Sequence, residues 1–219
     1  YSKISLDQLI KVNGFDTGVG SYTKTEWLIM VEHFIQLTEL KNEEYIYDIG
    51  CGSGAFLYAI KNYVNPYFYG IDYSESLIEI AKNCIDGNFV VSNADKLPTF
   101  GRKFDLVFSH SVFQYFPSVE FAFDVLRKTY NLLEKNGKLC LMDINDEEYE
   151  YESKKMRIRS FPNEITYNEF YKGCDHLYFS KSKIKNFLLS IGFKDIKIFK
   201  HAVEGDLVRK YRFNLIANK

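Results

Sequence analysis

The stretch Asp48-Ile-Gly-Cys-Gly-Ser-Gly54 follows the apolar run 45–49 and carries more information than any other part of this chain. Its three glycines stand at alternate positions, so the backbone can turn sharply out of a buried strand and lie close against a ligand. Asp48 adds a carboxylate at the end of the strand, where it suits an amino or ammonium group and repels a phosphate. The sequence therefore predicts a loop that contacts a ligand with a positive charge at this end.

Strand-like and helix-like segments alternate outward from this loop. Apolar and β-branched runs predict strands, and apolar residues at helical spacing predict helices. The expected order is strand 45–49, helix 55–62, strand 67–72, helix 75–83, strand 89–92, strand 104–109, helix 119–133 and strand 138–143. Strands separated by single helices are joined by right-handed crossovers. This order therefore predicts a doubly wound α/β domain, with helices on both faces of a mostly parallel sheet.

The C-terminal part of the chain departs from this alternation. A helix over 181–191 precedes two strands, 195–201 and 210–217, and the loop between these strands is too short to hold a helix. Strands joined in this way are antiparallel, so we expect the sheet to finish with an antiparallel strand. Residues 145–180 are polar and aromatic with weak periodicity. Because loops over the strand ends carry specificity, we expect this insertion to select the substrate.

Length and composition indicate a single domain over residues 1–219. The chain is 46% hydrophobic and 17% aromatic, which supports a sizeable core. At the N-terminal end we expect a helical lid over 1–42. Thr23 and Glu26 form a capping-box pattern, and apolar residues at helical spacing follow to about residue 40.

Charge and cysteine usage exclude several classes of partner. The 28 basic and 29 acidic residues leave a net charge of −1, which provides no general attraction to nucleic acid. The four cysteines include no CxxC and the four histidines no HxxxH, so we expect reduced thiols and no structural zinc. No apolar stretch approaches about 18 residues, and no signal-peptide pattern is present. We expect a cytoplasmic protein that acts as a monomer or homodimer without a membrane partner.

Acidic residues also stand where the later strands are expected to end. In a doubly wound sheet the ligand lies beyond the carboxyl ends of the strands, near the point where the strand order reverses. Asp72 ends the second strand, where a carboxylate can accept both hydroxyls of a ribose. Asp95 follows the third strand, at the expected position of an adenine edge, and Tyr73 is placed to cover that ring.

Five motifs in order resemble those of the class I S-adenosylmethionine-dependent methyltransferases. They are Asp48-Ile-Gly-Cys-Gly-Ser-Gly54, Gly70-Ile-Asp72-Tyr-Ser74, Asn93-Ala-Asp95, Phe104-Asp-Leu-Val-Phe-Ser-His-Ser-Val-Phe-Gln114-Tyr-Phe116 and Leu133-Glu-Lys-Asn-Gly137. The resemblance covers residues 45–143 and, more loosely, the final pair of strands. It implies a Rossmann-like, mostly parallel seven-stranded sheet whose last strand is antiparallel, which agrees with the ending inferred from loop length.

The resemblance also implies S-adenosyl-L-methionine as the cofactor and a role for each matching position. The glycines would approach the methionine part of the cofactor, with Asp48 near its ammonium group. Asp72 would hold the ribose hydroxyls, Tyr73 would pack on adenine, and Asp95 would accept from the adenine amino group. The cofactor-binding set that we expect is Tyr22, Asp48, Gly50, Cys51, Gly52, Gly54, Asp72, Tyr73, Asn93, Ala94, Asp95 and Ser109.

Two side chains are candidates for catalysis. His110 ends the fourth strand, and the pKa of histidine lies close to neutrality, so it is the best candidate for a general base. A donor that orients the cofactor and a passive wall are the two other interpretations of His110. Gln114 either faces the acceptor or caps the short turn before Pro117. Tyr22 closes over the cofactor or packs in the core.

Three further residue groups have competing interpretations. Asp95 could cap a turn around residues 97–98 instead of binding adenine. The basic cluster Lys154, Lys155, Arg157 and Arg159 suits an acidic or phosphorylated acceptor. Acidic neighbours within 146–152 favour a neutralised, solvated face. Oxygen ligands between 143 and 146 would suit Mg²⁺, but the fourth strand ends without a carboxylate, so we expect no metal.

The function that we expect is methyl transfer to an oxygen or nitrogen of a small molecule. The acceptor would be sugar-linked or phosphorylated and belong to cell-surface polysaccharide or secondary-metabolite biosynthesis. One alternative is an NAD(P)-dependent oxidoreductase, because Gly50, Gly52 and Ala55 satisfy the dinucleotide fingerprint. Asp48 and the antiparallel finish count against that alternative. The other is a non-catalytic S-adenosylmethionine-binding protein.

Overall fold

A seven-stranded sheet in the order β3-β2-β1-β4-β5-β7-β6 organises the computed structural model, which describes residues 4–15, 20–173, 176–203 and 208–219. The strands are β1 (Tyr45–Ile49), β2 (Tyr67–Asp72), β3 (Gly87–Val91), β4 (Phe104–His110), β5 (Leu133–Asn145), β6 (Lys194–Lys200) and β7 (Arg212–Asn218). Strands β1 to β5 pair in parallel, and β7 runs antiparallel to both of its neighbours. This confirms the predicted sheet. The strand order reverses between β1 and β4, where a ligand site is expected.

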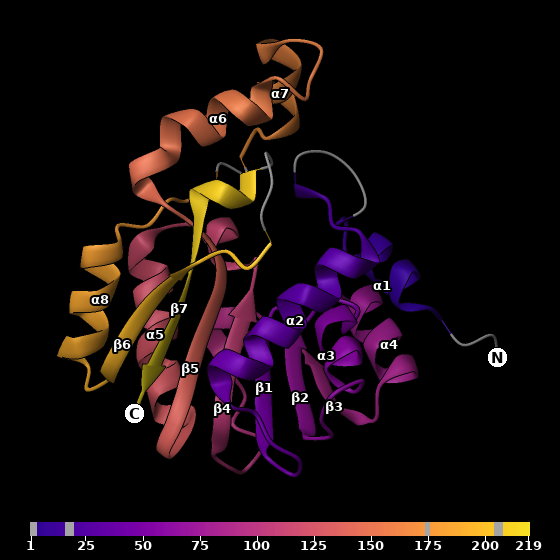
Figure 1. The fold of residues 1–219 in the computed structure, drawn as a ribbon, viewed down its shortest axis with the longest axis vertical. Helices are drawn as coiled ribbons and strands as arrows, with labels where there is room; N and C mark the ends of the chain where they lie inside the picture. The colour runs from indigo at the N-terminus through magenta and orange to yellow at the C-terminus, as the bar shows by residue number, and fades with distance from the viewer. Residues whose placement is uncertain (1–3, 16–19, 174–175, 204–207) are drawn as a thin grey trace.

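Helices cover both faces of the sheet (Figure 1). They are α1 (Leu6–Val12), α2 (Lys24–Thr38), α3 (Ala55–Ile60) and α4 (Glu75–Cys84) on one face, and α5 (Val119–Leu132) and α8 (Lys181–Ser190) on the other. Successive strand residues point to opposite faces. Ile46 therefore packs beneath the first group of helices, and Tyr47 beneath the second.

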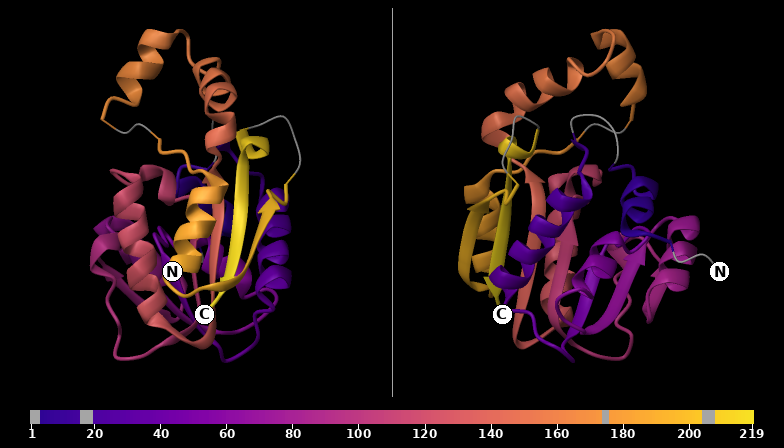
Figure 2. Two further views of the ribbon diagram at one scale, coloured as in Figure 1. Left: turned by 90° about the vertical axis from the view of Figure 1, so that its left-hand side faces the viewer. Right: turned by 45° about the vertical axis from the view of Figure 1, so that its right-hand side comes forward.

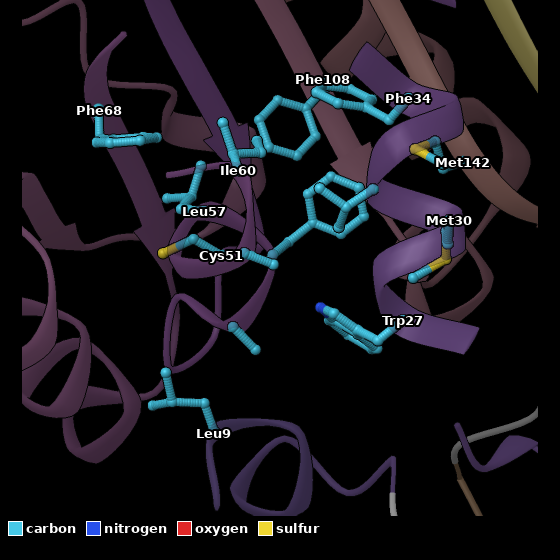
Figure 3. Packing of buried hydrophobic residues seen from close by; sticks show 14 of the residues in the cluster. Leu9, Trp27, Met30, Phe34, Cys51, Leu57, Ile60, Phe68, Phe108 and Met142 are labelled. Carbon is cyan, nitrogen blue, oxygen red and sulfur yellow. The ribbon is translucent and has the colours of Figure 1, made fainter. Parts of the chain in front are cut away.

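The core on the α2 face is rich in aromatic side chains. Trp27 and Phe34 point from α2 toward the sheet, where the rings of Phe34 and Phe108 lie 4.7 Å apart (Figure 3). The predicted capping box that begins this helix is present. The Thr23 side chain accepts from the Glu26 N–H at 3.2 Å, and the Glu26 carboxylate accepts from the Thr23 N–H at 2.7 Å.

Two helices within 145–180 were not predicted. After η4 (Glu147–Tyr149), α6 (Glu150–Ile158) and α7 (Glu164–Phe170) extend beyond the carboxyl end of β5, as both views show (Figure 1, Figure 2). Helix α6 buries only Ser153 and Arg157, and α7 buries no residue. Because neither helix has an apolar stripe, the hydrophobic pattern contained no helical signal to detect.

One boundary also differs from the prediction. Helix α5 ends at Leu132 and β5 begins at once, so Asn136, with φ of 70°, lies in a turn within β5 and not at the end of the helix. In the part of the chain that the structure describes, no helix is both long and apolar enough to cross a membrane.

Candidate active site

The glycine loop after β1 is held tightly at the switch point. Gly50 N–H donates to the Ile71 carbonyl at 2.8 Å, and Gly50 and Gly54 both have φ of 79°. A Cβ atom on Gly50 would lie 2.4 Å from the Val112 side chain, and one on Gly54 would lie 2.4 Å from Ile85. These positions require glycine for both conformation and space.

Asp48 lies near the end of β1, and its carboxylate is buried. The residue is 2% exposed, and its Oδ1 has no hydrogen-bond partner among the described residues. Burial, and then the charge of Asp72, raise its pKa well above the ordinary value. A buried carboxylate is costly unless it is paired, so this site is suited to a cationic group from a ligand.

Asp72 fixes the glycine loop from the end of β2. Its Oδ2 accepts from Gly52 N–H and its Oδ1 accepts from Ser74 N–H, each at 2.9 Å. Among the described residues neither oxygen accepts a second hydrogen bond, so each retains a further lone pair. The carboxylate can therefore accept ligand hydroxyls while it holds the loop in place.

The predicted adenine-side residues have few contacts with the protein. Tyr73 is 80% exposed, and Asn93 is exposed beside half-buried Ala94. Asp95 Oδ1 is buried without a partner, and within the described residues its side chain caps no turn. The turn-capping alternative for Asp95 is therefore wrong, and its predicted role with adenine stays a prediction.

Helix α1 packs directly on the glycine loop. The Asn13 side chain accepts from Ser53 N–H at 2.8 Å, and the Leu9 carbonyl accepts from the Ser53 hydroxyl at 3.1 Å. Sequence analysis did not single out Asn13 or Ser53. An asparagine at a helix end and a serine in a loop are both common as local caps, so nothing in the sequence marked them as partners.

His110 lies in an aromatic cluster that the N-terminal segment completes. Its ring centroid is 5.7 Å from Phe15, 6.3 Å from Tyr22, 5.3 Å from Trp27 and 5.1 Å from Phe56. Burial lowers the pKa of His110 to about 4, and its Nε2 has no partner among the described residues. The ring is neutral near pH 7 and is a weak base, which favours the orienting or wall role over the general-base role.

Tyr22 is buried in the same cluster. Its hydroxyl lies 3.0 Å from His201 Nε2, and Val203 N–H donates to His201 Nδ1 at 3.1 Å. The neutral His201 ring therefore carries its proton on Nε2 and donates to the Tyr22 oxygen. Sequence analysis named Tyr22 but missed His201, because the two residues are far apart in the chain.

A polar network joins the ends of β4, β5 and β7. Fully buried Asp143 accepts through Oδ2 from the Ser111 hydroxyl at 2.6 Å and from the Arg212 guanidinium. Burial opposes ionisation, but Arg212, followed by His201, holds the pKa of Asp143 well below its ordinary value. Gln114 donates to the Ser111 hydroxyl at 2.8 Å, and its Oε1 lacks a partner among the described residues.

The other predicted side chains near these strand ends serve the fold. The Ser109 hydroxyl donates to the Ile49 carbonyl at 2.8 Å and ties β4 to β1. Cys51 is buried in the glycine loop, and its thiol donates weakly to the Gly52 carbonyl at 3.7 Å. Their predicted contact with a cofactor stays a prediction.

The oxygen ligands between 143 and 146 do not converge. Asn145 accepts from Arg157 at 3.1 Å, and Asp146 pairs with Lys181, while Asp143 belongs to the network described above. The described part of the chain contains no group of three His, Cys, Asp or Glu side chains that could hold a metal ion.

The basic cluster of the insertion divides into two kinds of site. Lys154 is exposed and pairs with Glu150 at 2.6 Å, which agrees with a solvated face. Arg157 is only 3% exposed and its Nη1 has no partner among the described residues, so the solvated interpretation is wrong for this residue.

A family model described as a methyltransferase domain matches residues 40–195. A demethylmenaquinone methyltransferase of Thermotoga maritima is 29% identical over 123 residues, which is 55% of this chain and 51% of the relative. An uncharacterised protein of Methanocaldococcus jannaschii is 36% identical over 86 residues, which is 39% of this chain and 32% of the relative. The chain thus corresponds to about half or less of these curated relatives.

Solved structures share the fold at low sequence identity. A plantazolicin methyltransferase in complex with a triazolic desmethylPZN analog and SAH has a TM-score of 0.69 and 17% identity, over 97% of this chain and 91% of its own. A Haloferax volcanii protein in complex with the Trm112 methyltransferase activator has a TM-score of 0.70 and 16% identity, over 95% of this chain and 93% of its own.

Proposed function

This chain belongs to the methyltransferase domain family and uses S-adenosyl-L-methionine, and we propose that it transfers the methyl group to an oxygen or nitrogen atom of a small molecule. The observation that carries the proposal is the buried Oδ1 atom of Asp48 beside the glycine loop, which has no hydrogen-bond partner in the described part of the chain. The cofactor has an ammonium group on its amino-acid part, which would satisfy this carboxylate. The arrangement suits that ligand better than a pyrophosphate, which Asp48 would repel.

The residues at the switch point fit the other parts of the same cofactor. Asp72 holds the loop and keeps lone pairs for the ribose hydroxyls. Asp95 offers a buried oxygen without a partner to an adenine amino group, and the exposed ring of Tyr73 is free to pack on the base. Charge-assisted hydrogen bonds of this kind each contribute about 1.5–3 kcal/mol.

The bound cofactor supplies an electrophilic methyl group on a sulfonium ion. The chain's contribution is to align the acceptor with that methyl group and to exclude water, since water stabilises the charged ground state. Alignment in a near-attack geometry lowers a barrier by about 7–11 kcal/mol. The aromatic cluster around His110 includes Phe15, Tyr22 and Trp27, and its apolar rings would keep water away from the methyl group.

The N-terminal segment and the insertion take different roles in this proposal. Helices α1 and α2 act as the lid, because α1 binds the glycine loop through Ser53 and α2 supplies Trp27 to the cluster around His110. The insertion 145–180 selects the acceptor, because α6 and α7 extend past the ends of the strands (Figure 2). Biosynthesis of cell-surface polysaccharide or of secondary metabolites is the proposed setting.

Calorimetric titration separates this proposal from its alternatives. We expect S-adenosylhomocysteine to bind the protein and NAD⁺ not to bind, and Asp48→Asn to weaken the binding at least tenfold because the charge opposite the ammonium group is lost. Asp7→Asn, at an exposed site on α1, is the matched control and should change nothing. Binding of NAD⁺ alone would overturn the proposal. Binding without methyl transfer to any tested acceptor would favour the non-catalytic alternative.

A further inference from the structure

Three arginines near the carboxyl edge of the sheet are buried, and they differ in their partners. Arg209 pairs with Glu26 at 2.7 Å, and Arg212 pairs with Asp143. Arg157 donates through Nη2 to the Asn145 amide oxygen at 3.1 Å, and in the described part of the chain it forms no ion pair. A buried charge without a counter-ion is strongly unfavourable, so Arg157 is in an unusual state for a structural residue.

The acidic residues around α6 do not supply the missing counter-ion. Glu150 pairs with Lys154 and Glu147 with Lys183 at the outer surface, and buried Asp146 pairs with Lys181. In the described part of the insertion these three carboxylates pair with lysines, while the buried guanidinium of Arg157 contacts a neutral amide. Arg157 Nη1 is enclosed and has no partner among the described residues. The donor is available to an anion that comes from outside the chain.

Aromatic side chains surround this part of the insertion. The rings of Tyr167 and Tyr171 lie 4.9 Å apart, and His176 lies 5.2 Å from Tyr171 and 4.9 Å from Tyr115. The Tyr178 hydroxyl donates to Ser153 Oγ at 3.2 Å, one turn of α6 before Arg157. Such walls favour a ligand with a ring next to its anionic group.

Hydrogen bonds connect Arg157 to the site at the strand ends. Asn145, which holds Arg157, ends β5 and donates to the Leu177 carbonyl at 2.9 Å. Leu177 N–H in turn donates to the Gln114 carbonyl at 2.8 Å, and the Gln114 side chain binds Ser111 just beyond β4. An anion at Arg157 would therefore be connected through Asn145, Leu177 and Gln114 to Ser111, at the carboxyl edge of the sheet.

We propose that Arg157 is the anchor of the acceptor site, and that the methyl acceptor is a ring-bearing small molecule with a carboxylate or phosphate group. The planar guanidinium binds either anion through two parallel hydrogen bonds. Asn145 positions the guanidinium, and the aromatic side chains of the insertion contact the ring. The inference rests on the proposed methyl transfer and specifies which class of acceptor that reaction takes.

The test measures binding of simple probes in the presence of saturating S-adenosylhomocysteine, in a buffer free of phosphate. The probes are benzoate, phenyl phosphate and neutral benzamide, titrated by calorimetry. We expect at least one anion to bind tenfold or more tightly than benzamide, and Arg157→Gln to remove that preference while the affinity for S-adenosylhomocysteine stays within about twofold. Benzoate and phenyl phosphate distinguish an acid from a phosphate ester.

Two further variants keep the test decisive. Arg159→Gln removes an exposed neighbouring charge and should leave the preference intact. Asn145→Asp supplies the missing carboxylate within the chain, so it should weaken anion binding at least tenfold, even if Arg157→Gln does not fold. Equal binding of anions and benzamide, or an unchanged preference in Asn145→Asp, would overturn the inference. If the unaltered protein does not bind S-adenosylhomocysteine, the proposed cofactor is wrong, and this result is distinct from failure of the acceptor proposal.

Discussion

The two halves of the sheet form their parts of the site in different ways. In the half around β1, β2 and β3, functional side chains bind backbone groups close to their own strand ends, as Asp72 does with Gly52 and Ser74. In the half around β4, β5 and β7, side chains bind other side chains from distant segments, as Asp143 does with Arg212 and Tyr22 with His201. The first half needs only the correct backbone, whereas the second depends on the complete tertiary structure.

This difference predicts where substitutions act. Removal of a functional side chain in the first half should alter cofactor affinity with limited loss of stability, whereas a change to the glycine backbone should cost both. Changes in the second half should cost stability first, because its buried charges depend on one another.

The largest effect should come from Arg212→Met. It leaves the Asp143 carboxylate buried without its guanidinium partner, which costs about 3–5 kcal/mol of unfolding free energy. The control is Arg127→Met, which breaks an exposed pair with Asp124 and should cost less than about 1 kcal/mol. Urea unfolding at neutral pH measures both. Equal losses for the two variants would mean that the buried network is not a source of stability.

Gly50→Ala should have the second-largest effect on stability. The added methyl group meets both the positive φ and the Val112 side chain at 2.4 Å, so unfolding free energy should fall by roughly 2–4 kcal/mol and affinity for S-adenosylhomocysteine should fall at least tenfold. Gly101→Ala is the matched control, because its φ of 70° is similar and nothing lies within 4 Å. Gly101→Ala should lower the unfolding free energy by only about 1 kcal/mol and leave the affinity for S-adenosylhomocysteine unchanged. Similar effects at the two glycines would show that space at Gly50 is not limiting.

His110 should make the stability of the protein depend on pH in a specific range. Its folded-state pKa, about 4, lies below the ordinary value of 6.5, so the unfolded chain binds this proton first as the pH falls. Stability should therefore be lost between about pH 6.5 and 4, with roughly 2 kcal/mol lost from pH 7 to 5 on account of His110. His110→Phe should remove this part of the loss in urea unfolding at the two pH values. An unchanged pH dependence in that variant would contradict the neutral, buried imidazole.

Asp72→Ala should have the smallest effect, confined to the first half. Loss of its hydrogen bonds to ligand and loop should weaken S-adenosylhomocysteine binding at least tenfold, or about 1.4 kcal/mol. Asp124→Ala, at an exposed site on α5, serves as the control. Calorimetry gives the result directly, and an unchanged dissociation constant for Asp72→Ala would remove the residue from the cofactor site.

The same difference explains what the sequence alone could predict. The mostly parallel sheet, the antiparallel finish and the positions of Asp48 and Asp72 follow from strand ends and loop lengths, which are local properties. His201 and Arg212 carry no such mark, because their roles depend on partners 179 and 69 residues away in the chain. Arg157 was visible only as one of four basic residues. Its burial beside Ser153 on α6 depends on the tertiary structure, so nothing in the sequence separated it from the other three.

The most direct test of the central claim is a crystal structure of the protein with S-adenosylhomocysteine. The account predicts that the ligand's ammonium group lies within hydrogen-bond distance of Asp48 Oδ1, and that both ribose hydroxyls contact Asp72. An amino-acid part bound away from Asp48, with that carboxylate still unpaired, would contradict the account.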